Sequence, residues 1–158
     1  MILTVFSPKK APSFEVAEFA LGEFFSLSGI PPVPGHYLHD KDGAPYFDFS
    51  GAPFVSVSHS GEFVVAAISD KPVGVDIQLH TDIDFGSISK RFGMNATGKK
   101  DFFERFSAAE AKTKALRIPL PKSLSAPEAR IFDFIPGATL AVFGEGRIFF
   151  EFCFLSAL

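Results

Sequence analysis

The order of hydrophobic and polar positions predicts one helix and several strands in the first half of the chain. Residues 13–28 carry apolar side chains at helical spacing, Gly29 follows as a stop signal, and Pro31 and Pro32 forbid continuation. Alternating or continuous apolar runs predict strands over 2–6, 46–49, 54–59, 63–69 and 73–79. Only turn residues separate the last three runs, so we expect these three to form an antiparallel meander.

The second half of the chain repeats this order of elements. Helical spacing predicts helices over 85–92 and 99–116, followed by a proline-marked loop over 119–127. Strands are predicted over 129–134, 138–143 and 147–155, with Gly144-Glu145-Gly146 as a hairpin turn between the last two. We therefore predict an α+β fold of two similar halves, residues 1–71 and 72–158, each a helix packed on an antiparallel sheet.

Composition and charge exclude several classes of protein. Of the 158 residues, 47% are hydrophobic and 21% are charged, which is typical of a folded domain and not of a disordered chain. The 21 phenylalanines predict a Phe-packed core, with an apolar patch for a partner as an open alternative. A net charge of -3 lacks the basic field of a general nucleic-acid binder. The single cysteine, Cys153, excludes an internal disulfide and is expected to be a buried thiol.

The first residues of the chain do not resemble a signal peptide. Residues 1–6 lack a basic flank and a long apolar run. No apolar run approaches the roughly 20 residues of a membrane span. We therefore expect a cytoplasmic protein with no membrane partner.

Asp76 is the first candidate for chemistry, because a carboxylate in an apolar strand is expensive to bury without a partner. Gln78 lies two residues further along the strand, so both side chains point to the same face. A carboxylate and an amide oxygen on one face form half of a site for a hard cation. The alternative is an aspartate at a strand end that faces water.

Glu110 and Lys114 are the second candidate. They share one face of the long predicted helix with Phe106, because the three residues are spaced by four. The alternative is an exposed ion pair, which stabilises a helix by only a few tenths of a kcal/mol.

Two histidine motifs complete the candidates. His59 follows Ser58 at a strand end, where it is either a donor to a phosphate oxygen or an ordinary turn histidine. His36 and His39, followed by Asp40 and Asp42, could bind zinc, but a polar loop surface is the alternative. A hydrolase triad is not supported, because the chain has no Gly-x-Ser-x-Gly elbow.

Taken in order, three segments resemble the 4'-phosphopantetheinyl transferase superfamily, and its longer, pseudo-dimeric group most of all. They are 51–60 with Ser58-His59-Ser60, 72–78 with Gly74-Val75-Asp76-Ile77, and 106–116 with Glu110-x-x-x-Lys114. The resemblance covers 42–120 and implies two α+β halves related by a pseudo-twofold axis. It also implies a reaction in which the phosphopantetheine arm of coenzyme A passes, with Mg²⁺, to a serine of an apo acyl or peptidyl carrier protein.

The resemblance also implies a role for each matching residue. The metal ligands would be Asp76, Gln78 and Glu110. The residues that bind coenzyme A would be Ser58, His59 and Lys114. Glu110 and Lys114 would be catalytic, with Glu110 as the base that takes the serine proton.

Three positions depart from the usual pattern of the superfamily. Ala44 and Ala109 stand where lysines are usual, and Phe106 stands where tryptophan is usual. A charge-assisted hydrogen bond contributes about 1.5–3 kcal/mol, so coenzyme A binding is weakened unless other basic residues substitute. The candidates for substitution are Lys41, Lys90, Arg91 and His39. The alternative is a non-catalytic relative that binds a carrier protein or a nucleotide.

The proposed metal site also carries an expectation for stability. Carboxylates gathered without their cation repel one another. We therefore expect Asp76→Ala to leave the melting temperature unchanged or slightly raised.

Overall fold

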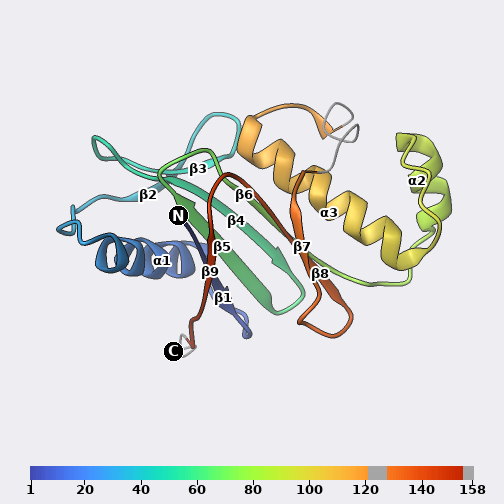
Figure 1. The fold of residues 1–158 in the computed structure, drawn as a ribbon, viewed down its shortest axis with the longest axis horizontal. Helices are drawn as coiled ribbons and strands as arrows, with labels where there is room; N and C mark the ends of the chain where they lie inside the picture. The colour runs from blue at the N-terminus through green and yellow to red at the C-terminus, as the bar shows by residue number, and fades with distance from the viewer. Residues whose placement is uncertain (121–127, 155–158) are drawn as a thin grey trace.

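The computed structural model describes residues 1–120 and 128–154. The α+β class is confirmed, and so are the three predicted helices: α1 (Ser13–Ser28), α2 (Phe85–Phe92) and α3 (Lys99–Leu116) (Figure 1). Residues 121–127 of the predicted loop and the end of the last predicted strand, Leu155, lie outside the described residues. Within those residues, no helix is long and apolar enough to cross a membrane.

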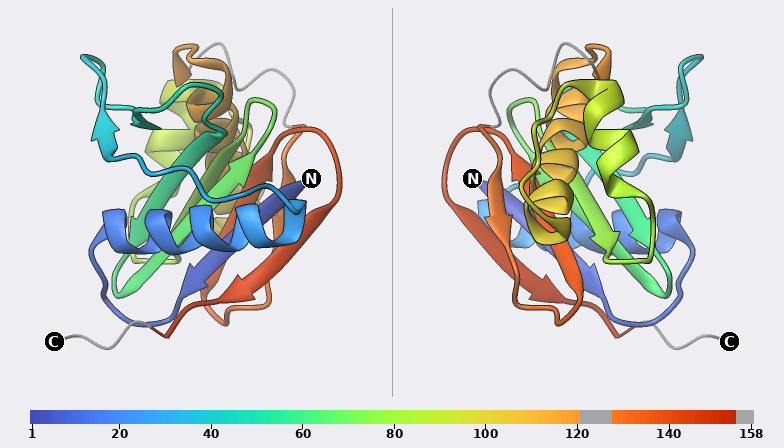
Figure 2. Two further views of the ribbon diagram at one scale, coloured as in Figure 1. Left: turned by 90° about the vertical axis from the view of Figure 1, so that its left-hand side faces the viewer. Right: turned by 90° about the vertical axis from the view of Figure 1, so that its right-hand side faces the viewer.

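A four-stranded sheet is formed by segments from both ends of the chain. Its order is β4 (Phe54–Ser60), β5 (Phe63–Ser69), β1 (Ile2–Ser7) and β9 (Ile148–Phe152). β5 is antiparallel to β4 and β1, whereas β9 is parallel to β1. Helix α1 covers one face of this sheet (Figure 2). There Leu3 and Val5 pack in one core cluster with Val16 and Ala20.

A three-stranded sheet packs on the other face of the first. It consists of β6 (Gly74–Leu79), β8 (Ala138–Phe143) and β7 (Arg130–Phe132), with β8 in the middle and antiparallel to both neighbours. A second core cluster joins the two sheets, with Ile2 and Phe6 from one sheet and Val75, Ile77 and Val142 from the other. Helix α3 packs on β6 and β8, so α1 and α3 lie on opposite sides of the molecule (Figure 2). A short antiparallel pair, β2 (Tyr37–His39) and β3 (Pro45–Phe47), lies beside β4.

The predicted meander is wrong in its third strand. β4 and β5 pair as expected, but β6 does not pair with β5, because β1 occupies the second edge of β5. β6 pairs with β8 instead. The predicted hairpin between 138–143 and 147–155 is wrong for the same kind of reason: β8 has both edges occupied by β6 and β7, and β9 joins β1.

The glycines of the expected hairpin turn carry the chain from one sheet to the other. Gly144 and Gly146 both have positive φ, at 149° and 104°. Their carbonyl groups accept hydrogen bonds from the Arg130 guanidinium, at 2.9 and 2.6 Å. The segment is thus a crossover fixed to β7, and both strands that it joins pair elsewhere.

Candidate functional site

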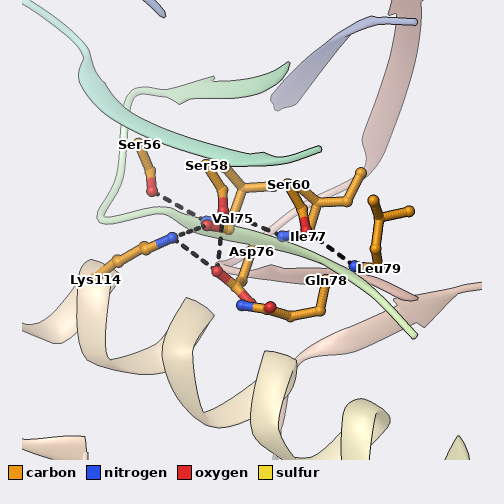
Figure 3. A network of polar contacts seen from close by, with 9 residues as sticks. All are labelled: Ser56, Ser58, Ser60, Val75, Asp76, Ile77, Gln78, Leu79 and Lys114. Carbon is orange, nitrogen blue, oxygen red and sulfur yellow. Dashed lines mark hydrogen bonds and ion pairs between the residues drawn. The ribbon is translucent and has the colours of Figure 1, made fainter. Parts of the chain in front are cut away.

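Asp76 is almost fully buried on the face of β6 that packs against α3. Its two neighbours, Val75 and Ile77, point the other way into the core between the sheets. The residue is 2% exposed, yet three of the described side chains donate to its carboxylate (Figure 3). Ser58 Oγ and Lys114 Nζ donate to Oδ1 at 3.0 and 2.9 Å, and Gln78 Nε2 donates to Oδ2 at 3.0 Å. The structure therefore brings together four of the six predicted site residues, from β4, β6 and α3.

Serine side chains of β4 take the place of a strand–strand backbone ladder along β6. The hydroxyl oxygens of Ser56, Ser58 and Ser60 accept hydrogen bonds from the backbone N–H groups of Val75, Ile77 and Leu79, at 3.1, 3.2 and 3.0 Å (Figure 3). The partner numbers rise together along both strands, so β6 runs parallel to β4 at this contact. We call these three residues the serine ladder. Ser58 is its central member and also donates to Asp76, so it couples the ladder to the buried carboxylate.

The distance between α3 and β6 is set by Gly74. A Cβ atom at Gly74 would lie 1.8 Å from the carbonyl oxygen of Ala111, so no larger residue fits without separating helix and strand. This close approach lets Lys114 reach across to β6, where its Nζ also donates to the Val75 carbonyl at 3.1 Å. The ammonium group is thus held by two acceptors of one strand.

Glu110 lies one turn before Lys114 on α3 and is half-buried. Burial raises the pKa of its carboxyl group above 4.5, the negative charge of Asp76 raises it further, and Lys114 partly opposes both effects. Among the residues that the structure describes, none donates a hydrogen bond to this carboxylate. The group is therefore a desolvated anion beside a second carboxylate, which is an arrangement that a bound cation would stabilise.

Asp76, its three donors and Glu110 are called the cluster below. His59 is the predicted site residue that lies apart from this cluster. Its side chain is exposed and points to the opposite face of β4 from Ser58, because neighbouring residues of a strand alternate. The zinc interpretation of the His36–Asp40 segment gains no support. His36 pairs with Asp48 at 3.1 Å, and Asp40 pairs with Arg117 at 2.7 Å.

The donor set of the cluster fits a hard cation better than zinc. Asp76 and Glu110 supply carboxylate oxygens, and Gln78 supplies an amide oxygen, which are the ligands that Mg²⁺ uses together with water and substrate phosphate. Within the described residues there is no group of three or more His, Cys, Asp and Glu side chains placed to hold a metal ion. A cation bound here would therefore have few protein ligands.

A cavity of about 730 Å³ adjoins the cluster, and Lys114 belongs to both. One wall is formed by 42–47 and 52–57, and the other by Val73 and the end of α3. Tyr46 and Phe54, both exposed, line it together with aliphatic side chains, so the cavity is largely apolar with cationic groups at one side. Its volume is in the range of sites for small molecules and cofactors.

The three departures from the superfamily pattern occupy different surroundings. Ala44 lines the cavity, so a lysine at this position would face a ligand there. Ala109 is 1% exposed in the interior. Phe106 packs with Phe102 and the residues of α2.

Two features of the site were missed by sequence reasoning. The serine ladder had a signal, since serines recur at 56, 58 and 60 on one face of an otherwise apolar strand. The second feature is Arg117, which lines the cavity just beyond the last residue of α3. The sequence carried no signal for it, because its place depends on a turn far away in the chain.

Fold and site together are those of an α+β protein with a buried polar cluster beside a cavity of ligand size. No protein-family model matches the chain. The chain is 33% identical over 90 residues to the 4'-phosphopantetheinyl transferase gsp of Aneurinibacillus migulanus. The match covers 51% of this chain and 37% of that relative, so the chain spans well under two thirds of the relative's length. The similarity supports the resemblance to the 4'-phosphopantetheinyl transferase superfamily.

Proposed function

We propose that the chain is a 4'-phosphopantetheinyl transferase that moves the phosphopantetheine arm of coenzyme A to a serine of an acyl or peptidyl carrier protein. The observation that carries this proposal is the buried Asp76 carboxylate, bonded to Lys114 and close to Glu110, at the side of a ligand-sized cavity. The partial similarity to a protein of that name supports it independently. The proposal includes a cytoplasmic location and two halves related by a pseudo-twofold axis.

In this proposal the cluster binds the pyrophosphate of coenzyme A. Asp76, Gln78 and Glu110 would hold Mg²⁺, which supplies charge neutralisation to the pyrophosphate during transfer. Among the described residues, Lys114 donates only to two acceptors of β6, which leaves one of its three donors for a phosphate oxygen. Ser58 fixes the Asp76 carboxylate, and His59 reaches the nucleotide end of the coenzyme from the outer face of β4.

The proposed reaction is a phosphoryl-type transfer. The carrier serine hydroxyl attacks the β-phosphorus, a new serine O–P bond forms, and the bond to the leaving adenosine 3',5'-bisphosphate breaks. Glu110 takes the proton of the attacking hydroxyl. Lys114 offsets the negative charge that moves to the bridging oxygen of the leaving group.

A non-catalytic binder of a carrier protein or nucleotide is the second candidate. It is favoured by one observation: Ala44 faces the cavity without the cation that the superfamily places there. Weak binding of the coenzyme would then leave a docking function without transfer.

Incubation with coenzyme A, Mg²⁺ and a panel of apo carrier proteins separates the two candidates. We expect the intact mass of at least one carrier to rise by one phosphopantetheine group, only when all components are present. Binding of a carrier without any mass increase across the panel would contradict the transferase and favour the binder.

A further inference from the structure

The cavity beside the cluster lacks the lysine that is usual at position 44, but it is lined by Arg117. Among the residues that the structure describes, its charged lining residues are Asp42, Lys114 and Arg117. None of the four substitutes considered from sequence, Lys41, Lys90, Arg91 and His39, lines it in the part of the chain that the structure describes. Arg117 and Ala44 line the same cavity from its two walls.

The Arg117 guanidinium keeps donors available for a ligand. Its side chain is 52% exposed, and Nη1 donates to Asp40 Oδ2 at 2.7 Å. Its Nε and Nη2 groups donate to no residue that the structure describes. An arginine has five N–H donors in a planar fork, which binds phosphate oxygens in pairs. Within the described residues, one bond to Asp40 therefore leaves most of the fork unused.

Asp40 holds this guanidinium against the turn that carries Ala44. Its Oδ1 accepts from the backbone N–H groups of Asp42 and Ala44, both at 2.9 Å, while Oδ2 accepts from Arg117. The Arg117 hydrogen bond, followed by that of the Ala44 N–H, lowers the pKa of Asp40 to about 2, so the pair is ionised at neutral pH. One carboxylate thus ties the end of α3 to the turn that forms the opposite wall.

The backbone of Arg117 is itself unusual. It caps α3 with φ 56° and ψ 37°, a left-handed conformation that glycine adopts more readily than a residue with a Cβ atom. Non-glycine residues in this region concentrate at functional sites. Arg117 therefore occupies a backbone conformation that is less favourable for arginine than for glycine.

We propose that Arg117 binds a phosphate group of the coenzyme in this cavity and replaces the cation that Ala44 does not supply, with Asp40 as its positioning residue. This inference rests on the proposed function, because it takes the ligand to be a phosphorylated nucleotide coenzyme. Arg117 and Lys114 then bracket the phosphates from one helix end. Asp40 keeps the fork on the cavity side by holding it to the turn.

The test is calorimetric titration of the whole chain with coenzyme A, dephospho-coenzyme A and pantetheine at one ionic strength. We expect Arg117→Gln to weaken coenzyme A binding by about tenfold or more, the loss for one charge-assisted contact. Pantetheine, which has no phosphate, should change by less than about twofold. If dephospho-coenzyme A is insensitive to the substitution, Arg117 contacts the 3'-phosphate; if it is equally sensitive, Arg117 contacts the pyrophosphate.

Matched variants separate phosphate binding from loss of an ion pair. Arg105→Gln removes an arginine that pairs with Asp101 on the same helix and should leave all affinities within about twofold. Adding Ala44→Lys to Arg117→Gln should restore the affinity to within about threefold of wild type, since position 44 faces the same cavity. Should Arg117→Gln fail to fold, Arg117→Lys keeps the charge without the fork, and we expect about threefold weaker coenzyme A binding with pantetheine unchanged.

If the wild type binds coenzyme A, two outcomes overturn the inference. One is an affinity of Arg117→Gln for coenzyme A that equals that of the wild type. Where Arg117→Gln does not fold, the same result for Arg117→Lys overturns it. The other is an equal loss for coenzyme A and pantetheine, which indicates a merely structural role. If the wild type does not bind coenzyme A at all, the proposed function fails, and the same titrations with adenosine 3',5'-bisphosphate test the anion site alone. Arg117-dependent binding of that nucleotide then upholds the site, and its absence overturns it.

Discussion

At the scale of single residues, the two carboxylates of the cluster have opposite relations to the fold. Asp76 is buried but has three hydrogen-bond donors, including the Lys114 ammonium group. Glu110 has none among the described residues and is destabilised in its ionised form by burial and by Asp76. Sequence reasoning treated both as members of one repulsive cluster, because it had no means of knowing that Lys114 and Ser58 reach Asp76.

Replacement of Asp76 should therefore lower stability, contrary to the expectation from sequence. Asp76→Ala removes the acceptor of three donors, and each donor left unpaired in a buried place costs about 1–3 kcal/mol. Because Lys114 is 30% exposed and Gln78 is half-buried, both can turn to water, which leaves Ser58 as the donor unpaired in a buried place. We therefore expect a total loss of about 2 kcal/mol in the free energy of unfolding. Urea denaturation measures it. Asp82→Asn, which breaks the exposed pair with Lys99, is the control and should cost less than about 0.5 kcal/mol.

Replacement of Glu110 should have the opposite sign, with a defined dependence on pH. The raised pKa means that the ionised carboxylate is less favourable in the folded chain than in the unfolded chain. This penalty is absent well below pH 4.5, where both states are protonated. It grows as the pH rises from 4.5 to the folded-state pKa, and it is complete above that pKa. Glu110→Gln should thus be more stable than wild type at about pH 8 and equal to it at about pH 4. Greater stability of the wild type at about pH 8 would show that the carboxylate has a favourable partner.

At the scale of elements, the site depends on how β4 and α3 hold β6. The limits of the helices and most strands could be predicted, because apolar periodicity is a local property of the sequence. Strand order could not, since β1 and β9 pair although residues 7 and 148 are far apart in the chain. The serine ladder shows the same limit: its residues were visible at 56, 58 and 60, but their partners on β6 depend on where β1 lies.

The serine ladder should be detectable amide by amide. Ser56→Ala leaves the buried N–H of Val75 without its acceptor and does not touch Asp76, so we expect a loss of about 1–3 kcal/mol in stability. In native-state hydrogen exchange, protection of the Val75 amide should fall more than that of Leu79, whose acceptor is Ser60. Equal protection of Val75 in variant and wild type would contradict the assigned acceptor.

Gly74 should be the least replaceable glycine at the interface between α3 and β6. Gly74→Ala places a Cβ atom against the Ala111 carbonyl, so helix and strand must separate, at a cost of about 3 kcal/mol or more. Gly22→Ala is the control, because nothing lies within 4 Å of its Cβ position in the interior of α1. That substitution should stabilise by about 0.5–1 kcal/mol. Thermal unfolding of both variants checks the pair, and equal effects would contradict the close approach.

At the scale of the whole molecule, the candidate site lies where the edges of two stacked sheets meet. β4 is the edge of one sheet and β6 the edge of the other, and α3 covers β6 from outside. The motifs could be predicted to converge, because Asp76, Gln78 and Lys114 each had a definite face on its element. Arg117 could not be predicted, because it enters the cavity only through the fold of the turn at 40–44.

The most direct test of the central claim is a time course of intact carrier mass with coenzyme A and Mg²⁺, for wild type and Glu110→Gln side by side. The wild type should convert an apo carrier protein to a product heavier by one phosphopantetheine group. Glu110→Gln should remain folded and yet show background conversion, because it lacks the proposed base. Transfer by Glu110→Gln at the wild-type rate, or no transfer by a wild type that binds both coenzyme A and the carrier, would contradict the account.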